Sequence, residues 1–440
     1  MSRPSFVAAA SAVALLAAAP APALALDVPA AKAAIDAQLD RDYPKLDALY
    51  KDIHTHPELG FQETATAAKL AKRMRALGFE VTEGVGKTGV VAIYKNGPGP
   101  IVLVRTELDA LPMEEKTGLP YASKAKQMWN GRETFVDHSC GHDIHMASWI
   151  GTAQALIAMK GQWSGTLMFV GQPSEESVGG AKAMLDDGLF TRFPRPDYGF
   201  ALHVDPTPYG QVAYKPGVIS SNSDSLDITF KGRGGHGSMP ATTIDPVMMA
   251  ARFTVDVQSV ISREKDPAAF GVVTVGAIQA GSAGNIIPDQ AILRGTIRSH
   301  DADVRAKILD GVQRTADGVA LIAGAPKPDV SMVAGGKAVI NDAALTARTA
   351  AVFKAAFGDM AVVQPAPGAA SEDYSEFIIA GVPSVYFSIG GLDPARLAEA
   401  HAKGEPVAAN HSPFFAPVPE PSIRTGVEAM TLAVLDVLGK

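Results

Sequence analysis

Cysteine is almost absent from this sequence of 440 residues, because Cys140 is the only one. A lone cysteine excludes a disulfide framework within the chain, since each disulfide needs two sulfur atoms. Positive charge is not in excess either: 39 Lys and Arg stand against 46 Asp and Glu, and the formal net charge is −7. This balance gives no electrostatic case for nucleic acid or an anionic membrane surface as a partner.

Long apolar runs are missing as well, except at the N-terminus. The stretch 6–19 is apolar or small throughout, follows Arg3, and precedes an A-x-A sequence at 23–25. This pattern is typical of a cleavable signal peptide, and the run is short for a membrane-spanning helix. We therefore expect residues 1–25 to be removed on export, leaving a periplasmic or secreted protein without a stable membrane span.

The single cysteine lies in a segment rich in metal-binding side chains, His-Ser-Cys-Gly-His-Asp-Ile-His at 138–145. Thiolate and imidazole groups suit a borderline-soft metal such as zinc. Cys140 and His142 are two residues apart, so in an extended segment both side chains would point the same way. A buried cysteine beside solvated histidines is the alternative, but so many N, S and O donors in one short segment favour metal binding.

The pattern of the chain predicts an α/β fold with an insertion. Helical periodicity at 63–77 and 144–160 alternates with buried-strand runs at 101–106, 167–170 and 198–203. This alternation is typical of a mostly parallel sheet with helices on both faces. From about residue 222 the order becomes βαββαβ, with strands at 225–231, 272–280 and 291–298 and helices at 246–261 and 301–323. That order predicts a smaller α+β domain with an antiparallel sheet.

The first pattern resumes after about residue 335, with a helix at 343–357, a strand at 383–389 and a final helix from 421. The length also exceeds what one compact core usually reaches. We therefore predict a catalytic domain in two parts, 26–221 and 335–440, interrupted by an inserted domain at 222–334.

Candidate polar residues follow the predicted strands. Glu107 and Asp109 follow the first strand, Glu175 and Glu176 follow the second, and His203 closes the third. Ligands of open α/β sheets collect outside the carboxyl ends of the strands. The sequence therefore predicts a site at this edge of the sheet.

Several short motifs together make the chain resemble the M20 metallopeptidase family, in the amidohydrolase branch of hippurate, N-acyl-amino-acid and auxin-conjugate hydrolases. They extend over nearly all of the sequence that follows the predicted signal peptide. In chain order the matching segments are 56–60, 109–112, 140–143, 172–176, 234–240, 285–289, 294–298, 371–373 and 411–414.

The resemblance implies two divalent metal ions, which would be held by Cys140, His142, Glu176, His203 and His411. Mixed donors of this kind suit zinc, manganese, cobalt or nickel, so the sequence does not identify the metal. The resemblance also makes Glu175 the general base, with Asp109 buttressing a histidine ligand. Without the family motif, His203 and His411 would be read as ordinary histidines.

The inserted domain supplies further candidates by resemblance. His236, in a glycine-rich turn, would polarise the substrate carbonyl, often across a dimer interface. Asn285 and Arg298 would bind the substrate's carboxylate, for which a guanidinium is an apt partner. From the residues alone, Arg298 remains open to interpretation as a plain surface arginine. A homodimer or larger homo-oligomer is the family-based expectation.

Other residues carry weaker expectations. His54 and His56 resemble a metal-binding pair but are predicted only to end a helix before a proline, and Asp143 is a candidate helix cap. Glu107 stands where relatives commonly have Asp, and the stretch 126–136 is longer than usual. These departures leave the preferred acyl group and amino acid open.

The sequence thus predicts an exported, metal-dependent amidohydrolase that cleaves the amide between an acyl or aroyl group and an amino acid with a free carboxylate. A dipeptidase or carboxypeptidase acting on free peptides is an alternative. A periplasmic protein that only binds metal or peptide is a second alternative, and Glu175 argues against it because binding needs no base.

Overall fold

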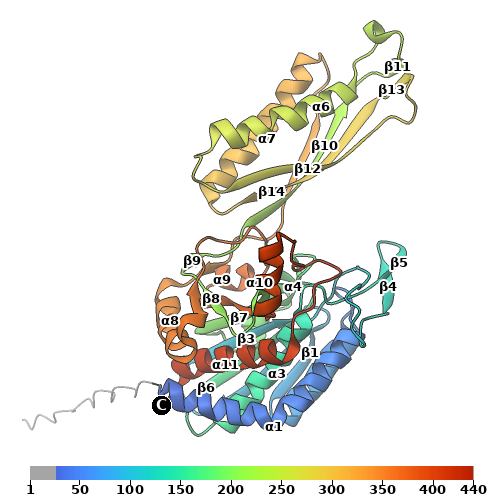
Figure 1. Cartoon of the computed structure of the whole chain (residues 1–440). Coiled ribbons are helices and arrows are strands. Elements are labelled where there is room, and N and C mark those ends of the chain that lie inside the picture. The colour runs from blue at the N-terminus through green and yellow to red at the C-terminus, as the bar shows by residue number, and fades with distance from the viewer. Residues whose placement is uncertain (1–25, 440) are drawn as a thin grey trace, which may run out of the picture.

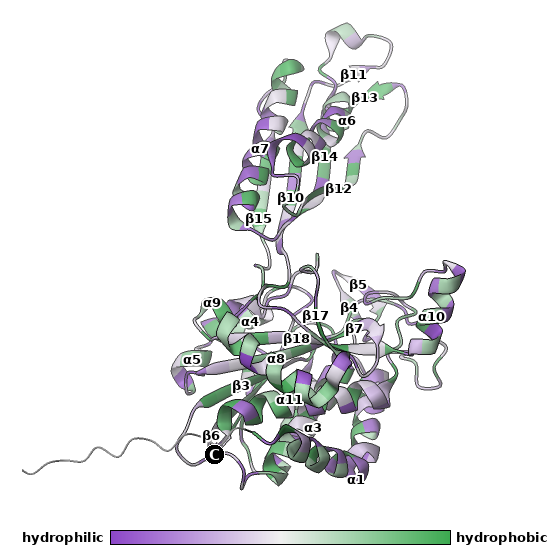
Figure 2. Cartoon of the chain, turned by 60° about the vertical axis from the view of Figure 1, so that its left-hand side comes forward, coloured by the Kyte–Doolittle hydropathy of each residue, from purple (hydrophilic) through white to green (hydrophobic). Residues whose placement is uncertain are grey.

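Two β-sheets, lying in separate regions of the molecule, organise the chain (Figure 1). The structure is a computed structural model that describes residues 26–439, so the predicted signal peptide at residues 1–25 lies outside the described residues. Figure 2 shows the same two regions after a rotation, joined by narrow connecting segments. In that junction, the backbone amide of Ser223 donates to the carbonyl of Gly336 over 2.8 Å.

The larger sheet has eight strands in the order β1-β2-β6-β3-β7-β18-β8-β17. Its central strands β6, β3, β7 and β18 run parallel, and β1, β2 and β8 make antiparallel pairings. The strand bounds are β1 Glu80–Val85, β2 Gly89–Asn96, β3 Ile101–Glu107, β6 Gly165–Gln172, β7 Tyr198–Pro208, β8 Val212–Tyr214, β17 Ala361–Val363 and β18 Ser384–Leu392. The predicted α/β class is confirmed.

Helices cover both faces of this sheet because alternate strand residues point to opposite sides. Val102 and Val104 of β3 face one core, whereas Leu103 faces the other. The first core includes α1 Val28–Thr55, α2 Thr64–Ala76, α3 His142–Ala158, α8 Ala343–Phe357 and α11 Pro419–Leu438. The second includes α4 Gly180–Asp186, α5 Leu189–Arg192 and α9 Ser375–Ile379.

The smaller sheet is antiparallel, in the order β12-β14-β10-β15. Its strands are β10 Asn222–Lys231, β12 Gly271–Ala280, β14 Gln290–Ser299 and β15 Asp329–Ala334. One face packs against α6 Pro246–Asp256 and α7 Ala302–Ile322, where Ile228 and Phe230 meet Phe253 and Val312 in a core of their own. The predicted domain limits at 222 and 334 coincide with the first residue of β10 and the last residue of β15.

Short elements complete the description of both regions. The smaller region also contains β11 Gly235–His236, β13 Ile286–Ile287, η1 Pro240–Thr242 and the π-helical η2 Val260–Glu264. The larger region also contains β4 Lys126–Trp129, β5 Arg132–Phe135, β9 Gly217–Val218, β16 Ile340–Asn341, η3 Gly358–Met360 and α10 Pro394–Lys403. No helix among residues 26–439 has the length and apolar character needed to cross a membrane.

Three expectations from the sequence differ from the structure. His203 does not close its strand, because β7 continues to Pro208 alongside β18. The last helix begins at Pro419, two residues before the predicted start, with a proline in its first turn where no amide hydrogen is needed. The helix predicted at 246–261 ends at Asp256.

Candidate active site

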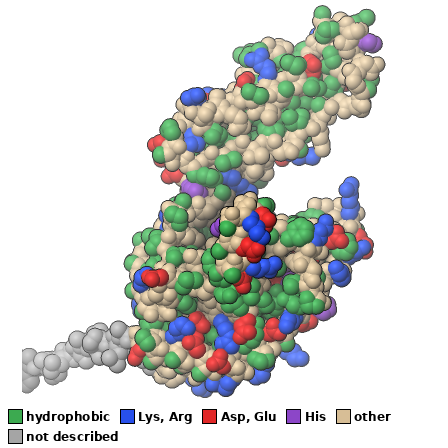
Figure 3. All heavy atoms as spheres, viewed as in Figure 1, with side chains coloured by type: hydrophobic (Ala, Val, Ile, Leu, Met, Phe, Trp, Pro, Cys, Tyr) green, Lys and Arg blue, Asp and Glu red, His purple; other side chains and the backbone are tan. Residues whose placement is uncertain are grey.

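A cavity of about 550 Å³ lies beside the larger sheet near the carboxyl ends of β6 and β7, and both regions contribute to its lining. Figure 3 shows that the molecule is hollowed between the two regions. Residues of the larger region at one end of the cavity are Cys140, Glu175, Glu176, His203 and His411. Arg298 of β14 enters the lining from the smaller region.

A tight turn before α3 presents the predicted metal ligands Cys140 and His142. Gly141, between them, has a φ of 89° and is the N-cap of the helix. A Cβ at this position would collide with Val204, so the turn requires glycine both for its conformation and for its close packing.

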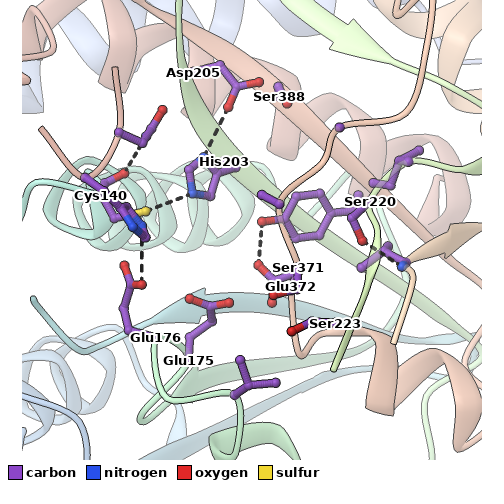
Figure 4. Close-up of a pocket in the computed structure, with 18 of the residues that line it drawn as sticks. Cys140, Glu175, Glu176, His203, Asp205, Ser220, Ser223, Ser371, Glu372 and Ser388 are labelled. Carbon is purple, nitrogen blue, oxygen red and sulfur yellow. Dashed lines mark hydrogen bonds and ion pairs between the residues drawn. The ribbon is translucent and has the colours of Figure 1, made fainter. Parts of the chain in front are cut away.

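The five predicted ligands come together around Cys140. Figure 4 shows Cys140, Glu176 and His203 of this cluster. The Cys140 sulfur lies 3.4 Å from Nε2 of His203, and His411 Nε2 lies 3.3 Å from a carboxylate oxygen of Glu176. The other Glu176 oxygen is 3.8 Å from Nε2 of His142. Cys140 belongs to two groups of potential metal donors. One group also contains His142 and His203, and the other also contains Glu176 and His411.

Unpartnered polar atoms show that this cluster fits divalent metal ions. His142 donates from Nδ1 to the backbone carbonyl of Asp109 over 2.8 Å, and its buried Nε2 has no hydrogen-bond partner among the described residues. One buried oxygen of Glu176 also lacks a partner there. Such atoms are costly to leave unpaired, at about 1–3 kcal/mol each. Coordination of a cation satisfies them, and the S, N and O donors suit zinc-like ions.

The electrostatics of the thiol support the same interpretation. Burial, together with Glu176 and Glu175, raises the pKa of the Cys140 thiol well above its ordinary value. A cation beside the sulfur reverses this effect, because a coordinating thiol loses its proton.

Glu175 and Asp109 contact the cluster without joining the two groups around Cys140. One Glu175 oxygen is 4.0 Å from His142 Nε2, and its side chain lies between Glu176 and Glu372 on the cavity wall (Figure 4). Burial, and then the neighbouring Glu372, raise the pKa of Glu175 well above its ordinary value. The Asp109 carboxylate accepts from the backbone amide of Glu176 over 3.0 Å, and the Asp109 backbone carbonyl accepts from His142. Asp109 therefore contacts two predicted ligands.

Comparison with known proteins identifies the family. The model of Peptidase family M20/M25/M40 matches residues 103–436. The chain belongs to this family. Hippurate hydrolase of Campylobacter jejuni is 40% identical over 278 residues, which are 63% of this chain and 70% of that protein. Thermostable carboxypeptidase 2 of Saccharolobus solfataricus is 36% identical over 345 residues, which are 77% and 84% of the two chains.

A solved structure shares the architecture of this M20 chain. The dinuclear metal binding peptidase of the M20 family from Bacillus subtilis matches with a TM-score of 0.73 and 27% identity, covering 90% of this chain and 99% of that one. The resemblance inferred from the motifs is therefore confirmed, and the protein is a metal-dependent hydrolase of the M20 family.

Backbone strain surrounds the site of this M20 hydrolase. Ser174, Val178 and His411 have φ values of 51°, 52° and 65°, in the left-handed region that non-glycine residues seldom adopt. Strain of this kind costs about 1–3 kcal/mol per residue and concentrates at functional sites.

A buried arginine that the sequence interpretation missed lies beneath the site. Arg105 donates to Gln172 over 2.9 Å and to Glu372 over 2.7 Å, and it also pairs with Glu107. Glu107 in turn accepts from Nδ1 of His145 over 2.9 Å. A charged side chain within a buried strand needs charged or polar partners. The position of Arg105 within the predicted buried strand 101–106 was therefore a signal of this network in the sequence.

A second buried network corrects the interpretation of Asp143 and His54. The cap of α3 is Gly141, whereas Asp143 lies within the first turn and contacts Nδ1 of His54 over 2.6 Å. The other His54 nitrogen is 3.2 Å from Glu115. Burial alone would lower the pKa of His54, but the two carboxylates raise it to about 10. His54 therefore contacts the first turn of α3 through Asp143. The prediction that a helix ends before the proline at 57 is confirmed, because α1 ends at Thr55.

Two predicted site residues lie apart from the cavity. His236 and Asn285 are together in the β11–β13 part of the smaller region, where the Asn285 carbonyl accepts from the amide of Gly237 over 2.8 Å (Figure 1). His236 is exposed, and its Nδ1 accepts from the hydroxyl of Ser238 over 2.8 Å. Neither residue lines the 550 Å³ cavity, whereas Arg298 does.

Proposed function

We propose that this M20 hydrolase cleaves the amide bond of N-acyl or N-aroyl amino acids. The observation that carries the proposal is one cavity lined by four of the five predicted ligands, the buried Glu175 and Arg298, with the fifth ligand, His142, grouped with Cys140 and His203. Such a cavity combines a place for the scissile amide with a partner for a free carboxylate. The similarity to hippurate hydrolase supports the same substrate class.

In this proposal two divalent ions are held by Cys140, His142, Glu176, His203 and His411. Ions held there would act as Lewis acids and would generate a nucleophile from water near neutral pH. The histidine ligands are oriented from behind: His203 donates from Nδ1 to the carbonyl of Val204 over 3.0 Å, which leaves Nε2 facing the sulfur of Cys140.

Glu175 serves as the proton carrier. It accepts a proton from water as the water oxygen bonds to the carbonyl carbon, and it returns that proton to the amide nitrogen as the C–N bond breaks. Its place on the cavity wall, beside a ligand rather than within a donor group around Cys140, suits this task.

Arg298 binds the carboxylate of the amino acid in this proposal. Its Nη1 donates to the hydroxyl of Ser371 over 3.0 Å, and a guanidinium has further donors for a bidentate contact with the substrate. His236 and Asn285 lie apart from the cavity of their own subunit, so in this proposal they act on the cavity of a second subunit. The proposal therefore includes a homodimer.

Export to the periplasm or the medium is part of the proposal and depends on the signal-peptide pattern of residues 1–25. The test is whether secreted protein begins after the A-x-A sequence at 23–25, which N-terminal sequencing measures.

A carboxypeptidase or dipeptidase is the second candidate, and the similarity to thermostable carboxypeptidase 2 favours it. Metal-analysed protein should be assayed on N-benzoylglycine, N-acetyl amino acids and dipeptides with the same C-terminal residue. The proposal expects the N-acyl compounds to have the higher kcat/KM. Faster turnover of the dipeptides would support the second candidate, and no turnover of either would overturn both.

A further inference from the structure

The segment 364–371 forms one wall of the cavity and contacts both regions of the molecule. Gln364, Gly368, Ala370 and Ser371 belong to the cavity lining. On the side of the larger region, this wall is fixed by backbone hydrogen bonds. The amide of Gly368 donates to the carbonyl of Ile219 over 2.8 Å, and the amide of Ser221 donates to the carbonyl of Ala370 over 2.8 Å.

Arg298 of β14 and His300, which directly follows this strand, hold the same wall from the smaller region. Arg298 Nη1 donates to the hydroxyl of Ser371 over 3.0 Å, and His300 Nε2 donates to the carbonyl of Gly368 over 2.9 Å. The two residues are separated by one position at the end of the strand, and both side chains reach the same wall. The wall is therefore joined to β14 at two points.

Phe270 fixes the orientation of the His300 ring. The two rings are stacked, with their centroids 4.2 Å apart and an interplanar angle of 19°. Phe270 directly precedes β12, and its neighbour Gly271 pairs with Ser299 in the sheet. The sheet thus supports both rings, and the imidazole reaches Gly368 from a fixed position.

We propose that His300 is a positioning residue for substrate binding, because it holds the Gly368 wall against the end of β14 and so fixes Arg298 relative to the metal-ligand cluster. The proposal rests on the proposed function, in which the substrate carboxylate binds Arg298 while the amide lies at the cluster. A substrate that spans the two regions binds well only when their separation is held. Arg298 supplies one of the two hydrogen bonds to this wall, at Ser371, and His300 supplies the other, at Gly368.

Three substitutions at His300 separate this role from general stability. The amide nitrogen of glutamine lies as many bonds from the backbone as imidazole Nε2, so His300→Gln retains a donor for Gly368. The amide of His300→Asn is one carbon shorter, and His300→Ala has no donor. His401→Ala is the matched control, because His401 is an exposed histidine of α10 outside the cavity lining.

The measurements are KM and kcat on the N-acyl amino acid that the wild type hydrolyses best, with metal content and Tm as further readouts. A lost hydrogen bond of about 0.5–1.5 kcal/mol corresponds to a roughly 2–12-fold rise in KM. We expect that rise for His300→Ala and His300→Asn, with kcat within about twofold of wild type and full metal content. His300→Gln and His401→Ala should keep a KM close to wild type.

A substrate without the carboxylate gives a second test of the same idea. For the corresponding N-acyl amino acid amide, the KM of His300→Ala should equal that of the wild type, because Arg298 then has no carboxylate to bind. An unchanged KM of His300→Ala on the acid, an equal defect on the amide, or a defect in His300→Gln as large as in His300→Ala would each overturn the proposal. Inactivity of the wild type on every N-acyl amino acid would instead overturn the proposed function.

Discussion

Glu175 and Glu176 are adjacent in sequence and both approach Nε2 of His142, at 4.0 and 3.8 Å, but their carboxylates otherwise have different neighbours. Glu176 reaches His411 over 3.3 Å and belongs to a donor group with Cys140, whereas Glu175 faces the cavity beside Glu372. The two residues lie in a turn, in which the amide of Val178 donates to the carbonyl of Glu175 over 2.7 Å, and Ser174 just before them has a φ of 51°. The difference suits the proposed function, in which Glu175 transfers the proton and Glu176 holds metal.

Replacement of Glu175 should remove catalysis and leave the metal in place. General acid–base groups contribute about 10²–10⁴-fold to turnover, so Glu175→Gln should lower kcat by about that factor. Metal analysis of the same preparation should give the wild-type content. Glu176→Gln is the matched control and should lose metal as well as activity. Near-normal turnover by Glu175→Gln would contradict its role.

Replacement of the one side chain that both donor groups share should weaken metal binding in both groups. Cys140 belongs to both groups, so Cys140→Ala should retain much less metal than the wild type. A chelator should abolish wild-type activity and lower Tm, since a ligand that binds only the folded state stabilises it. Added zinc, manganese, cobalt or nickel should restore both in the wild type alone. Full metal occupancy in Cys140→Ala would count against the cluster.

The fold was predictable from local patterns, whereas the set of site residues was predictable only through the family resemblance, since His203 and His411 alone would be read as ordinary histidines. The alternation between 101 and 203 predicted the parallel strands, and the bounds of α8 agree with the predicted helix. The helix α10 was missed although its start carries a clear signal, because Asp393 caps it and Pro394 occupies its first turn.

Contacts between distant segments were not predictable where no family motif pointed to them. Arg105 meets Glu372, 267 residues further along the chain, and His300 meets Gly368 through a backbone carbonyl. No local pattern encodes such pairs, since they depend on how two sheets and a loop pack. The assignment of Asp143 as a cap failed for the same reason, because its partner His54 is 89 residues away.

Loss of Arg105 should destabilise the fold strongly. The side chain is buried with Glu107 and Glu372, and removing one partner of a buried ion pair costs about 3–5 kcal/mol. Arg105→Met should therefore lower the free energy of unfolding by about that amount in urea titrations. Adding Glu372→Gln should recover part of the loss by removing an unpaired charge. Arg314→Met, which removes two ion pairs of an exposed arginine, should change stability little. A small effect of Arg105→Met would show that the network is dispensable.

The His54 network should make stability depend on alkaline pH. Its pKa is raised to about 10 in the folded protein from an ordinary value of 6.5. Because the pKa of His54 is higher in the folded protein than in the unfolded chain, its protonation stabilises the fold fully below about pH 6.5. This stabilisation is lost as the pH rises through about 10. The urea midpoint of the wild type should therefore fall between pH 6.5 and 10 by more than that of His54→Gln. Parallel midpoints for the two proteins across this range would contradict the assignment.

The charge of the cavity should restrict the side chain of the substrate's amino acid. Arg298 is the only arginine or lysine among the described residues that line the cavity, against Glu175, Glu176, Asp205 and Glu372. The two proposed divalent ions would offset Glu175 and Glu176, so a second substrate carboxylate would be repelled where it binds away from the ions, near Asp205 or Glu372. Charges several ångströms apart near a protein surface interact by about 1–2 kcal/mol. We therefore expect kcat/KM for N-benzoylglutamate to be about tenfold lower than for N-benzoylleucine. Gln364→Lys should narrow this gap by adding a cation to the lining, whereas the neutral Gln364→Met should leave it unchanged. Equal or faster hydrolysis of the glutamate conjugate by the wild type would contradict the electrostatic argument.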